Sequence, residues 1–163
     1  MFRKIKPKAG QESVWDYPRP PLLEATNKHI RIVFNQKVIA ETNHALRMLE
    51  TSHPPVYYLP LDCIVAEVLH RSDRQSFCEF KGMAGYYDLK VGEQVVKNAA
   101  WYYSSPSVRY LKLKNHVAFY PSMMDACYVN DEKVQAQEGD FYGGWITSDI
   151  VGPFKGGSGT WGW

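Results

Sequence analysis

The chain has 163 residues, a formal net charge of +2 and 45% hydrophobic residues. This length corresponds to one domain with a sizeable core, and the composition excludes a largely disordered chain. The nearly balanced charge gives no electrostatic reason to expect nucleic acid as a partner, and no apolar run is long enough to span a membrane. Because three widely spaced cysteines accompany a polar start without a signal peptide, we expect a cytoplasmic protein with reduced thiols.

The N-terminal third of the chain predicts an arm, a hairpin and a short helix. Residues 1–11 are basic and lack apolar periodicity, which is typical of a mobile arm. Segments 29–34 and 38–42 are rich in β-branched residues and flank a tight turn, so they predict a hairpin. Residues 43–50 contain good helix formers, and one or two helical turns are expected there.

A series of strands separated by turns follows. Residues 61–70 fit a helix or a strand equally well, and residues 71–75 have the composition of a polar loop. A short helix is expected at residues 107–114. Strands are expected at 56–59, 77–80, 83–90, 94–103, 116–120 and 126–130, with three of them forming an antiparallel meander across residues 77–103.

This pattern predicts a single mainly β domain over residues 12–138, with one or two short helices and a sandwich, barrel or two-sheet tent architecture. From residue 139 the composition changes to Gly and Trp, including Trp145, Trp161 and Trp163. Large aromatic side chains are normally buried, so we expect the tail, residues 139–163, to wrap its own domain. A lid over a cleft, or a docking segment that joins two copies into a homodimer, are the alternatives.

One stretch places three ionisable residues at spacing three, immediately before a rigid Pro-Pro pair. Arg47 can hold a carboxylate or phosphate through two hydrogen bonds, and Glu50 can orient or charge the imidazole of His53. The alternative is structural: Arg47 and Glu50 form an ion pair, and His53 bonds to a turn. The sequence alone favours neither.

Cys78 is the candidate nucleophile, because the cation of Lys81 favours a reactive thiolate while Glu79 opposes it. A buried structural thiol is the alternative. Trp101 and Tyr103 belong to an aromatic set that can line a pocket or fill an ordinary core. The cysteines are not paired at zinc-site spacing, so no metal site is predicted, and no cofactor is identified.

Five motifs follow one another along the chain: LETSHPPVYYLP at 49–60, FCEFKG at 77–82, AGYY at 84–87, NAAWYY at 98–103 and VAFYP at 117–121. Together they resemble domain-of-unknown-function family 427, a bacterial and fungal family labelled as a nucleotidyltransferase-type domain. The resemblance spans about residues 14–163. It implies a β-tent (Mss4-like) fold, in which two antiparallel sheets lean together. Many relatives of that fold bind zinc through four cysteines, which this chain lacks.

Together these observations predict a mainly β protein, two antiparallel sheets packed as a β-tent, with a cleft between the sheets for a small anionic metabolite. The alternatives are nucleotidyl transfer, as the family label suggests, and an oligomeric interaction module built on the tail. Neither a membrane nor nucleic acid is an expected partner. The candidate catalytic residues are His53, Glu50 and Cys78, and the candidate ligand-binding residues are Arg47, Tyr57, Lys81, Trp101 and Tyr103.

Overall fold

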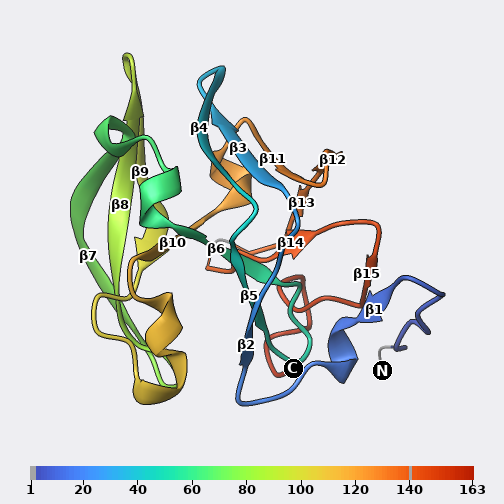
Figure 1. Cartoon of the computed structure of the whole chain (residues 1–163). Helices are drawn as coiled ribbons and strands as arrows, with labels where there is room; N and C mark the ends of the chain where they lie inside the picture. Colours follow the sequence, from blue (N-terminus) through green and yellow to red (C-terminus); the bar gives the residue numbers. More distant parts are fainter. Residues whose placement is uncertain (1–2, 140) are drawn as a thin grey trace.

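A computed structural model describes residues 3–139 and 141–163 and shows a mainly β architecture (Figure 1). The described residues contain fifteen strands and five short helices, all of the 3-10 type. The predicted fold class is therefore confirmed, with more helical turns than expected. Residues 1, 2 and 140, which belong to the predicted arm and tail, lie outside the described residues.

The largest sheet has seven antiparallel strands in the order β2-β5-β6-β10-β9-β8-β7. The meander β7-β8-β9 forms one side of the molecule in Figure 1, and it confirms the predicted three-stranded unit. The strands are β2 (Leu22–Ala25), β5 (Leu46–Leu49), β6 (Val56–Pro60), β7 (Leu69–Cys78), β8 (Gly82–Val91), β9 (Gln94–Tyr102) and β10 (His116–Phe119).

A second sheet has four strands in the order β12-β11-β3-β4. The predicted hairpin is confirmed as β3 and β4, and its turn residues Asn35 and Gln36 have φ values of 47° and 64°. Two consecutive positive φ values are typical of the type I′ turn, whose twist matches that of the flanking strands. The strands are β3 (Ile30–Phe34), β4 (Lys37–Thr42), β11 (Ala126–Val129) and β12 (Glu132–Lys133).

Two small sheets attach the ends of the described chain to this framework. β1 (Glu12–Ser13) pairs in parallel with β15 (Ile150–Val151), and β13 (Gln135–Ala136) pairs antiparallel with β14 (Trp145–Ile146). The 3-10 helices are η1 (Val14–Asp16), η2 (Leu61–Cys63), η3 (Ala66–Val68), η4 (Val108–Leu113) and η5 (Pro121–Met123).

Two local predictions were wrong. Residues 43–50 do not form a helix, because β5 lies between β2 and β6 and all four of its residues are buried. Burial on both faces outweighs helix propensity there. Residues 71–75 are not a loop but part of β7, an edge strand whose pairing with β8 shifts register between Arg71 and Gln75. Its polar composition reflects the exposure of that edge.

The two faces of the seven-stranded sheet are packed differently. We call the face that packs against the four-stranded sheet the core face, and the opposite one the tyrosine face. Alternate residues of each strand face opposite ways, so neighbours such as Tyr57 and Tyr58 belong to different clusters. The core face includes Tyr57, Leu59, Leu89, Ala100, Val117 and Phe119, and the tyrosine face includes Met48, Tyr58, Tyr86, Trp101, Tyr103 and Tyr120.

The N-terminal and C-terminal segments lie side by side in the part of the molecule away from β7 (Figure 1). The backbone N–H of Ile5 donates to Gly152 O at 3.1 Å, and the side-chain amide of Gln11 donates through Nε2 to Ser148 O at 3.1 Å. Trp145 is fully buried in the core-face cluster, whereas Trp161 is 88% exposed. The division into arm, domain and tail stays a prediction.

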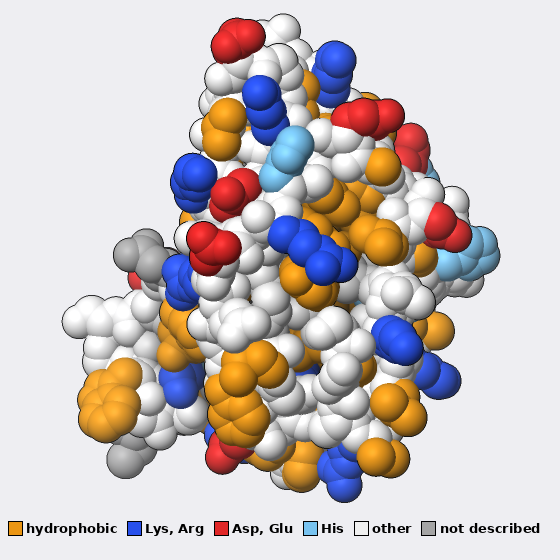
Figure 2. Space-filling view, turned by 90° about the vertical axis from the view of Figure 1, so that its left-hand side faces the viewer, with side chains coloured by type: hydrophobic (Ala, Val, Ile, Leu, Met, Phe, Trp, Pro, Cys, Tyr) orange, Lys and Arg blue, Asp and Glu red, His pale blue; other side chains and the backbone are white. Residues whose placement is uncertain are grey.

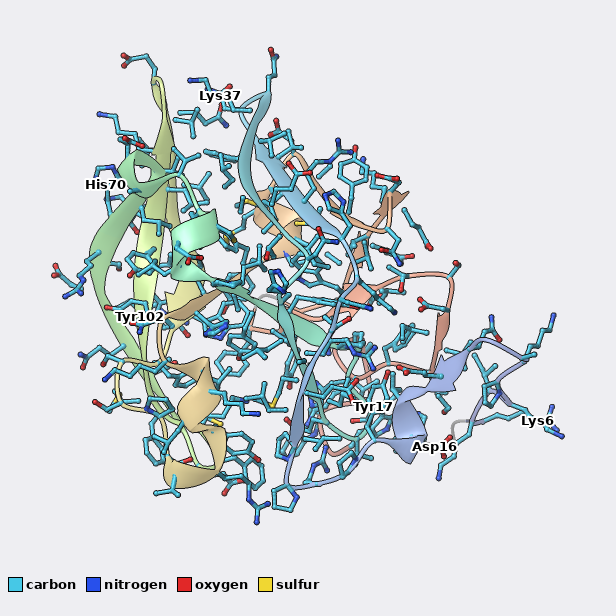
Figure 3. The ribbon with its side chains drawn as sticks, viewed as in Figure 1. Lys6, Asp16, Tyr17, Lys37, His70 and Tyr102 are labelled. Carbon is cyan, nitrogen blue, oxygen red and sulfur yellow. The ribbon has the colours of Figure 1, made fainter. Side chains whose placement is uncertain are left out.

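Figure 2 shows the side formed by β7 and its neighbours, where hydrophobic groups lie among Lys and Arg side chains. Figure 3 places His70 and Tyr102 on this side, away from Tyr17 near β1. Across residues 3–139 and 141–163, the structure contains no helix that is long and apolar enough to cross a membrane.

Candidate functional site

A cavity of about 370 Å³ lies against the tyrosine face of the seven-stranded sheet. Its size is within the range of small-molecule sites. Strands β5 to β9 supply one wall, and the segment between β13 and β14 supplies another. Six of the eight predicted site residues line it: Glu50, His53, Cys78, Lys81, Trp101 and Tyr103.

The location of this cavity corrects the sequence-based expectation. The space between the two main sheets is filled by the core-face cluster, because both sheets present apolar side chains to it. The cavity lies on the other face of the larger sheet, where tyrosines and a C-terminal segment replace the second sheet.

Arg47 and Tyr57 do not reach the cavity, because they are register partners on β5 and β6 and face the opposite way from Met48 and Tyr58. The guanidinium of Arg47, 4% exposed, donates two hydrogen bonds of 3.1 Å to Glu12 and bonds of 2.7 and 3.0 Å to Glu24. Arg47 therefore has a structural role, as the alternative interpretation held, but its ion-pair partners are Glu12 and Glu24 and not Glu50.

Tyr57 packs on Trp145 with ring centroids 4.9 Å apart, inside the core-face cluster. Burial raises the pKa of its phenol. A neutral, enclosed phenol with an aromatic neighbour on the core face stabilises the core and has no contact with the cavity.

Glu50 and His53 enter the cavity from the turn after β5. The backbone N–H of His53 donates to Glu50 O at 3.0 Å, which closes that turn. Nε2 of His53 lies 3.7 Å from the Glu50 carboxylate, which is itself 3.4 Å from Nε of Arg19. Burial lowers the pKa of the imidazole to about 4, and the cations of Lys155, Arg19 and Lys81 act in the same direction. His53 is therefore neutral at pH 7.

Cys78 and Lys81 enter from the end of β7 and the turn to β8. Lys81 is held by its backbone, whose carbonyl accepts the N–H of Ser107 at 3.0 Å. Burial lowers the pKa of its ammonium, but the phenol of Tyr58, the thiol of Cys78 and Glu50 outweigh burial, and the net pKa is raised. Lys81 therefore stays protonated, with its cation beside the sulfur of Cys78.

Aromatic side chains form the floor of the cavity. Nε1 of Trp101 donates to the hydroxyl of Tyr58 at 3.3 Å, and the rings of Trp101 and Tyr120 lie 4.5 Å apart. The hydroxyls of Ser76 and Tyr86 lie 2.9 Å apart. The floor thus offers flat apolar surface and hydroxyl groups together.

Five cavity residues come from the C-terminal part of the chain and were missed from the sequence: Gln137, Phe141, Tyr142, Gly143 and Lys155. A Cβ at Gly143 would lie 2.2 Å from Cη2 of Trp101, and at Gly144 it would lie 2.5 Å from Oε1 of Gln137. Only glycine permits so close an approach. The Gly143-Gly144 pair, directly before β14, was the available signal, since glycines at a strand often mark a backbone that approaches another group.

Within the part of the chain that the structure describes, no group of three His, Cys, Asp or Glu side chains lies close enough together to hold a metal ion. Lys81, Lys155 and the neutral imidazole of His53 are instead suited to carboxylate or phosphate oxygens. The two carboxylates at the cavity differ: Glu50 lies beside Arg19, and Glu79 is exposed to solvent, which screens its charge.

Comparison with known protein families identifies a match. A family model described as a domain of unknown function (DUF427) matches residues 22–130, and a search of curated proteins finds no match. The matched range includes His53, Cys78, Lys81 and Trp101 and ends before the C-terminal cavity residues. Since the match covers more than half of the chain, this protein belongs to the DUF427 family.

Proposed function

We propose that this protein binds a small anionic metabolite in the cavity on the tyrosine face. The observation that carries the proposal is the position of two lysines, Lys81 and Lys155, at a cavity of about 370 Å³ with an aromatic floor. Nζ of Lys155 lies 6.0 Å from the centroid of the Tyr142 ring, which is itself 5.4 Å from the His53 ring, and the cations of Lys155 and Lys81 both lower the pKa of His53. We therefore assign both lysines to the His53 end of the cavity. A ligand with a carboxylate or phosphate at this end would pair with both.

The remaining residues support a division of roles. His53 faces the same end and offers a neutral hydrogen-bonding group. Trp101 and Tyr103 offer flat surface for the body of the ligand, as in many small-molecule sites. The Glu50 carboxylate lies 3.7 Å from Nε2 of His53, beyond hydrogen-bond distance. The Tyr142 ring, 5.4 Å from that of His53, closes the cavity from the C-terminal side.

Calorimetric titration and thermal unfolding with defined anions test this proposal. The probes are inorganic phosphate, pyrophosphate, succinate, citrate and ATP with Mg²⁺, the last of which also tests the nucleotidyl transfer of the family label. At least one probe is expected to raise the Tm in a concentration-dependent way. Lys81→Met and Lys155→Met should weaken its binding at least tenfold.

Lys133→Met is the matched control, because Lys133 is an exposed lysine of β12 on the other sheet. It should bind the probe like the wild type. Binding that is equally strong in Lys81→Met and Lys155→Met, or no binding of any probe, would overturn the proposed anion site.

Chemistry at Cys78 is a second candidate function, favoured by the interaction between the Lys81 ammonium and the Cys78 sulfur. A thiolate there would attack an electrophilic carbon of the bound ligand. Iodoacetamide provides a direct measure: the sulfur forms a bond to carbon, iodide leaves and the thiol proton goes to solvent. Alkylation of Cys78 should slow at least tenfold in Lys81→Met, with Cys63 as internal control. An unchanged rate would exclude activation by Lys81.

The oligomeric interaction module is a third candidate, favoured by the exposure of the Trp161 side chain in the C-terminal segment. Light scattering of the wild type and of Trp161→Ser tests it. A dimer that dissociates in the variant would support this role, and a monomer in both would exclude it.

A further inference from the structure

The buried side chain of Gln137 connects the C-terminal segment to His53. Gln137 follows β13 and is 4% exposed. Its Nε2 lies 3.3 Å from Nδ1 of His53 and donates to the backbone carbonyl of Lys155 at 2.6 Å, and its Oε1 accepts the N–H of Gly144 at 3.0 Å. Every polar atom of this amide is therefore engaged.

These contacts fix the orientation of the amide. If the amide were turned over, its oxygen would face the Lys155 carbonyl and its NH₂ group would face the Gly144 N–H, so two attractive contacts would become repulsive. The NH₂ group consequently faces Nδ1 of His53. An NH₂ group only donates, so Nδ1 must accept. A neutral imidazole that accepts at Nδ1 carries its proton on Nε2.

We infer that Gln137 is a positioning residue that holds His53 as the neutral tautomer with its proton on Nε2, so that His53 donates a hydrogen bond to an oxygen of the ligand and does not act as a base. The part of this inference that concerns the ligand rests on the proposed function. The part that concerns the tautomer rests on the contacts of Gln137 alone.

The cations around the His53 ring also favour the neutral imidazole. Lys155 from the C-terminal segment, Arg19 from the N-terminal segment and Lys81 from the β7–β8 turn all disfavour an imidazolium. Glu50 is the carboxylate within 4 Å of Nε2, and it lies beside Arg19. Protonation at Nδ1 would also replace the hydrogen bond from Gln137 with two opposed donors.

This arrangement narrows the ligand chemistry. Nε2–H, Lys81 and Lys155 are all donors, so the cavity end matches a group with several acceptor oxygens and no proton to give. A carboxylate or a phosphate fits, and a cationic amine does not. His53 then resembles an oxyanion-binding group, which stabilises negative charge on a ligand oxygen without a proton transfer.

The tautomer is measured by ¹⁵N NMR of the histidine side chains in the ligand-free protein. Long-range ¹H–¹⁵N correlation spectra distinguish Nε2–H, Nδ1–H and imidazolium forms, and His53→Leu assigns the signal among the five histidines. We expect the Nε2–H pattern for His53 from pH 8 down to pH 5. A wild-type Nδ1–H or imidazolium pattern at pH 7 would overturn the inference.

Gln137→Glu is the matched variant, since it keeps the shape and replaces the donor with an acceptor for Nδ1–H. The His53 signal should change to the Nδ1–H or imidazolium pattern at pH 7, and an unchanged pattern would show that Gln137 does not set the tautomer. The exposed His44 provides the internal reference, and the spread of the other histidine signals shows that the variant is folded.

Phosphate titrations separate the two claims. If inorganic phosphate binds the wild type, His53→Leu should weaken it about tenfold, and the Nε2 signal of the wild type should shift on binding. Phosphate binding with an unmoved Nε2 signal would refute the donor role while leaving the anion site intact. An Nε2–H tautomer without binding of any anion would refute the proposed function while leaving the positioning role intact.

Discussion

The two faces of the seven-stranded sheet are built from the same strands but differ in how their cations are paired. On the core face, the buried cation Arg47 is matched by the carboxylates of Glu12 and Glu24, and aliphatic side chains fill the remaining space. On the tyrosine face, Lys81 and Lys155 line a cavity, and Nζ of Lys155 also donates to Trp163 O at 3.3 Å. A buried charge needs a partner. The contrast teaches that a cation is a structural element where the chain supplies its carboxylate, and a candidate for ligand recognition where the chain leaves space.

The largest expected effect on stability tests whether side chains are packed more tightly on the core face than on the tyrosine face. Trp145→Ala should lower the free energy of unfolding by about 3–5 kcal/mol, because the ring is fully buried against Tyr57. Trp101→Ala should cost less, since that ring already borders the cavity. Urea unfolding measures both variants. Equal losses would contradict the contrast between the faces.

The second effect concerns the pH dependence contributed by the tyrosine face. Folding lowers the pKa of His53 from 6.5 to about 4, so between these values the unfolded state binds more protons. This contribution to stability is fully present above pH 6.5 and is lost as the pH falls to about 4. It approaches about 3 kcal/mol at roughly 1.4 kcal/mol per pKa unit.

Urea unfolding between pH 7 and pH 4 measures this slope. His53→Leu should show a smaller decrease in stability than the wild type. His44→Gln, a change at an exposed histidine, should keep the wild-type slope. Parallel curves for the wild type and His53→Leu would show that His53 is not buried as neutral imidazole.

The third effect tests the cover of the cavity. Gly143→Ala should cost about 1–3 kcal/mol by overpacking, because its Cβ would meet the Trp101 ring at 2.2 Å. Gly162→Ala provides the control, since a Cβ there would have no heavy atom within 4 Å. Thermal unfolding compares them. A harmless Gly143→Ala would mean that the segment does not lie against Trp101.

The smallest effect concerns the matched cation of the core face. Arg47→Met should cost about 1–2 kcal/mol, less than for a fully buried pair, because Glu12 and Glu24 are partly hydrated. Burial raises the pKa of Glu12, but hydrogen bonds from Arg47 and Tyr17 outweigh it and lower the net pKa.

This lowered pKa gives the Arg47 variant a signature in acid. The contribution of Glu12 is present above its unfolded pKa near 4.5 and is lost as the pH falls through the lower folded value. The wild type should therefore lose more stability between pH 7 and pH 3 than Arg47→Met in urea unfolding. Equal losses would show that the pair does not stabilise the fold.

The parts of the fold that depend on local chemistry could be predicted from the sequence. The β3–β4 hairpin follows from β-branched strands around a turn that begins at Asn35, a residue type that tolerates positive φ. Residues 43–50 were misassigned because their composition suits a helix, while their state depends on pairing with β2 and β6. The pairing with β2 joins segments on either side of the β3–β4 hairpin and leaves no local signal.

The residues of the candidate site were likewise predictable only where they are close together in the sequence. Cys78 and Lys81, and Trp101 and Tyr103, were grouped correctly because short spacing along a turn or strand places them on one side. Arg47 was grouped with His53 on the assumption of helical spacing, whereas in a strand a shift of one residue changes the face. Gln137 and His53 are 84 positions apart, and no pattern in the sequence connects them.

The pairing of the C-terminal segment with the tyrosine face also sets an order of events during synthesis. Trp101 leaves the ribosome before Gly143, and at about 5–20 residues per second the interval is several seconds. Throughout that time the aromatic floor has no cover, so a nascent chain exposes the surface that the finished protein encloses. The cavity is therefore assembled last, by the residues that close it.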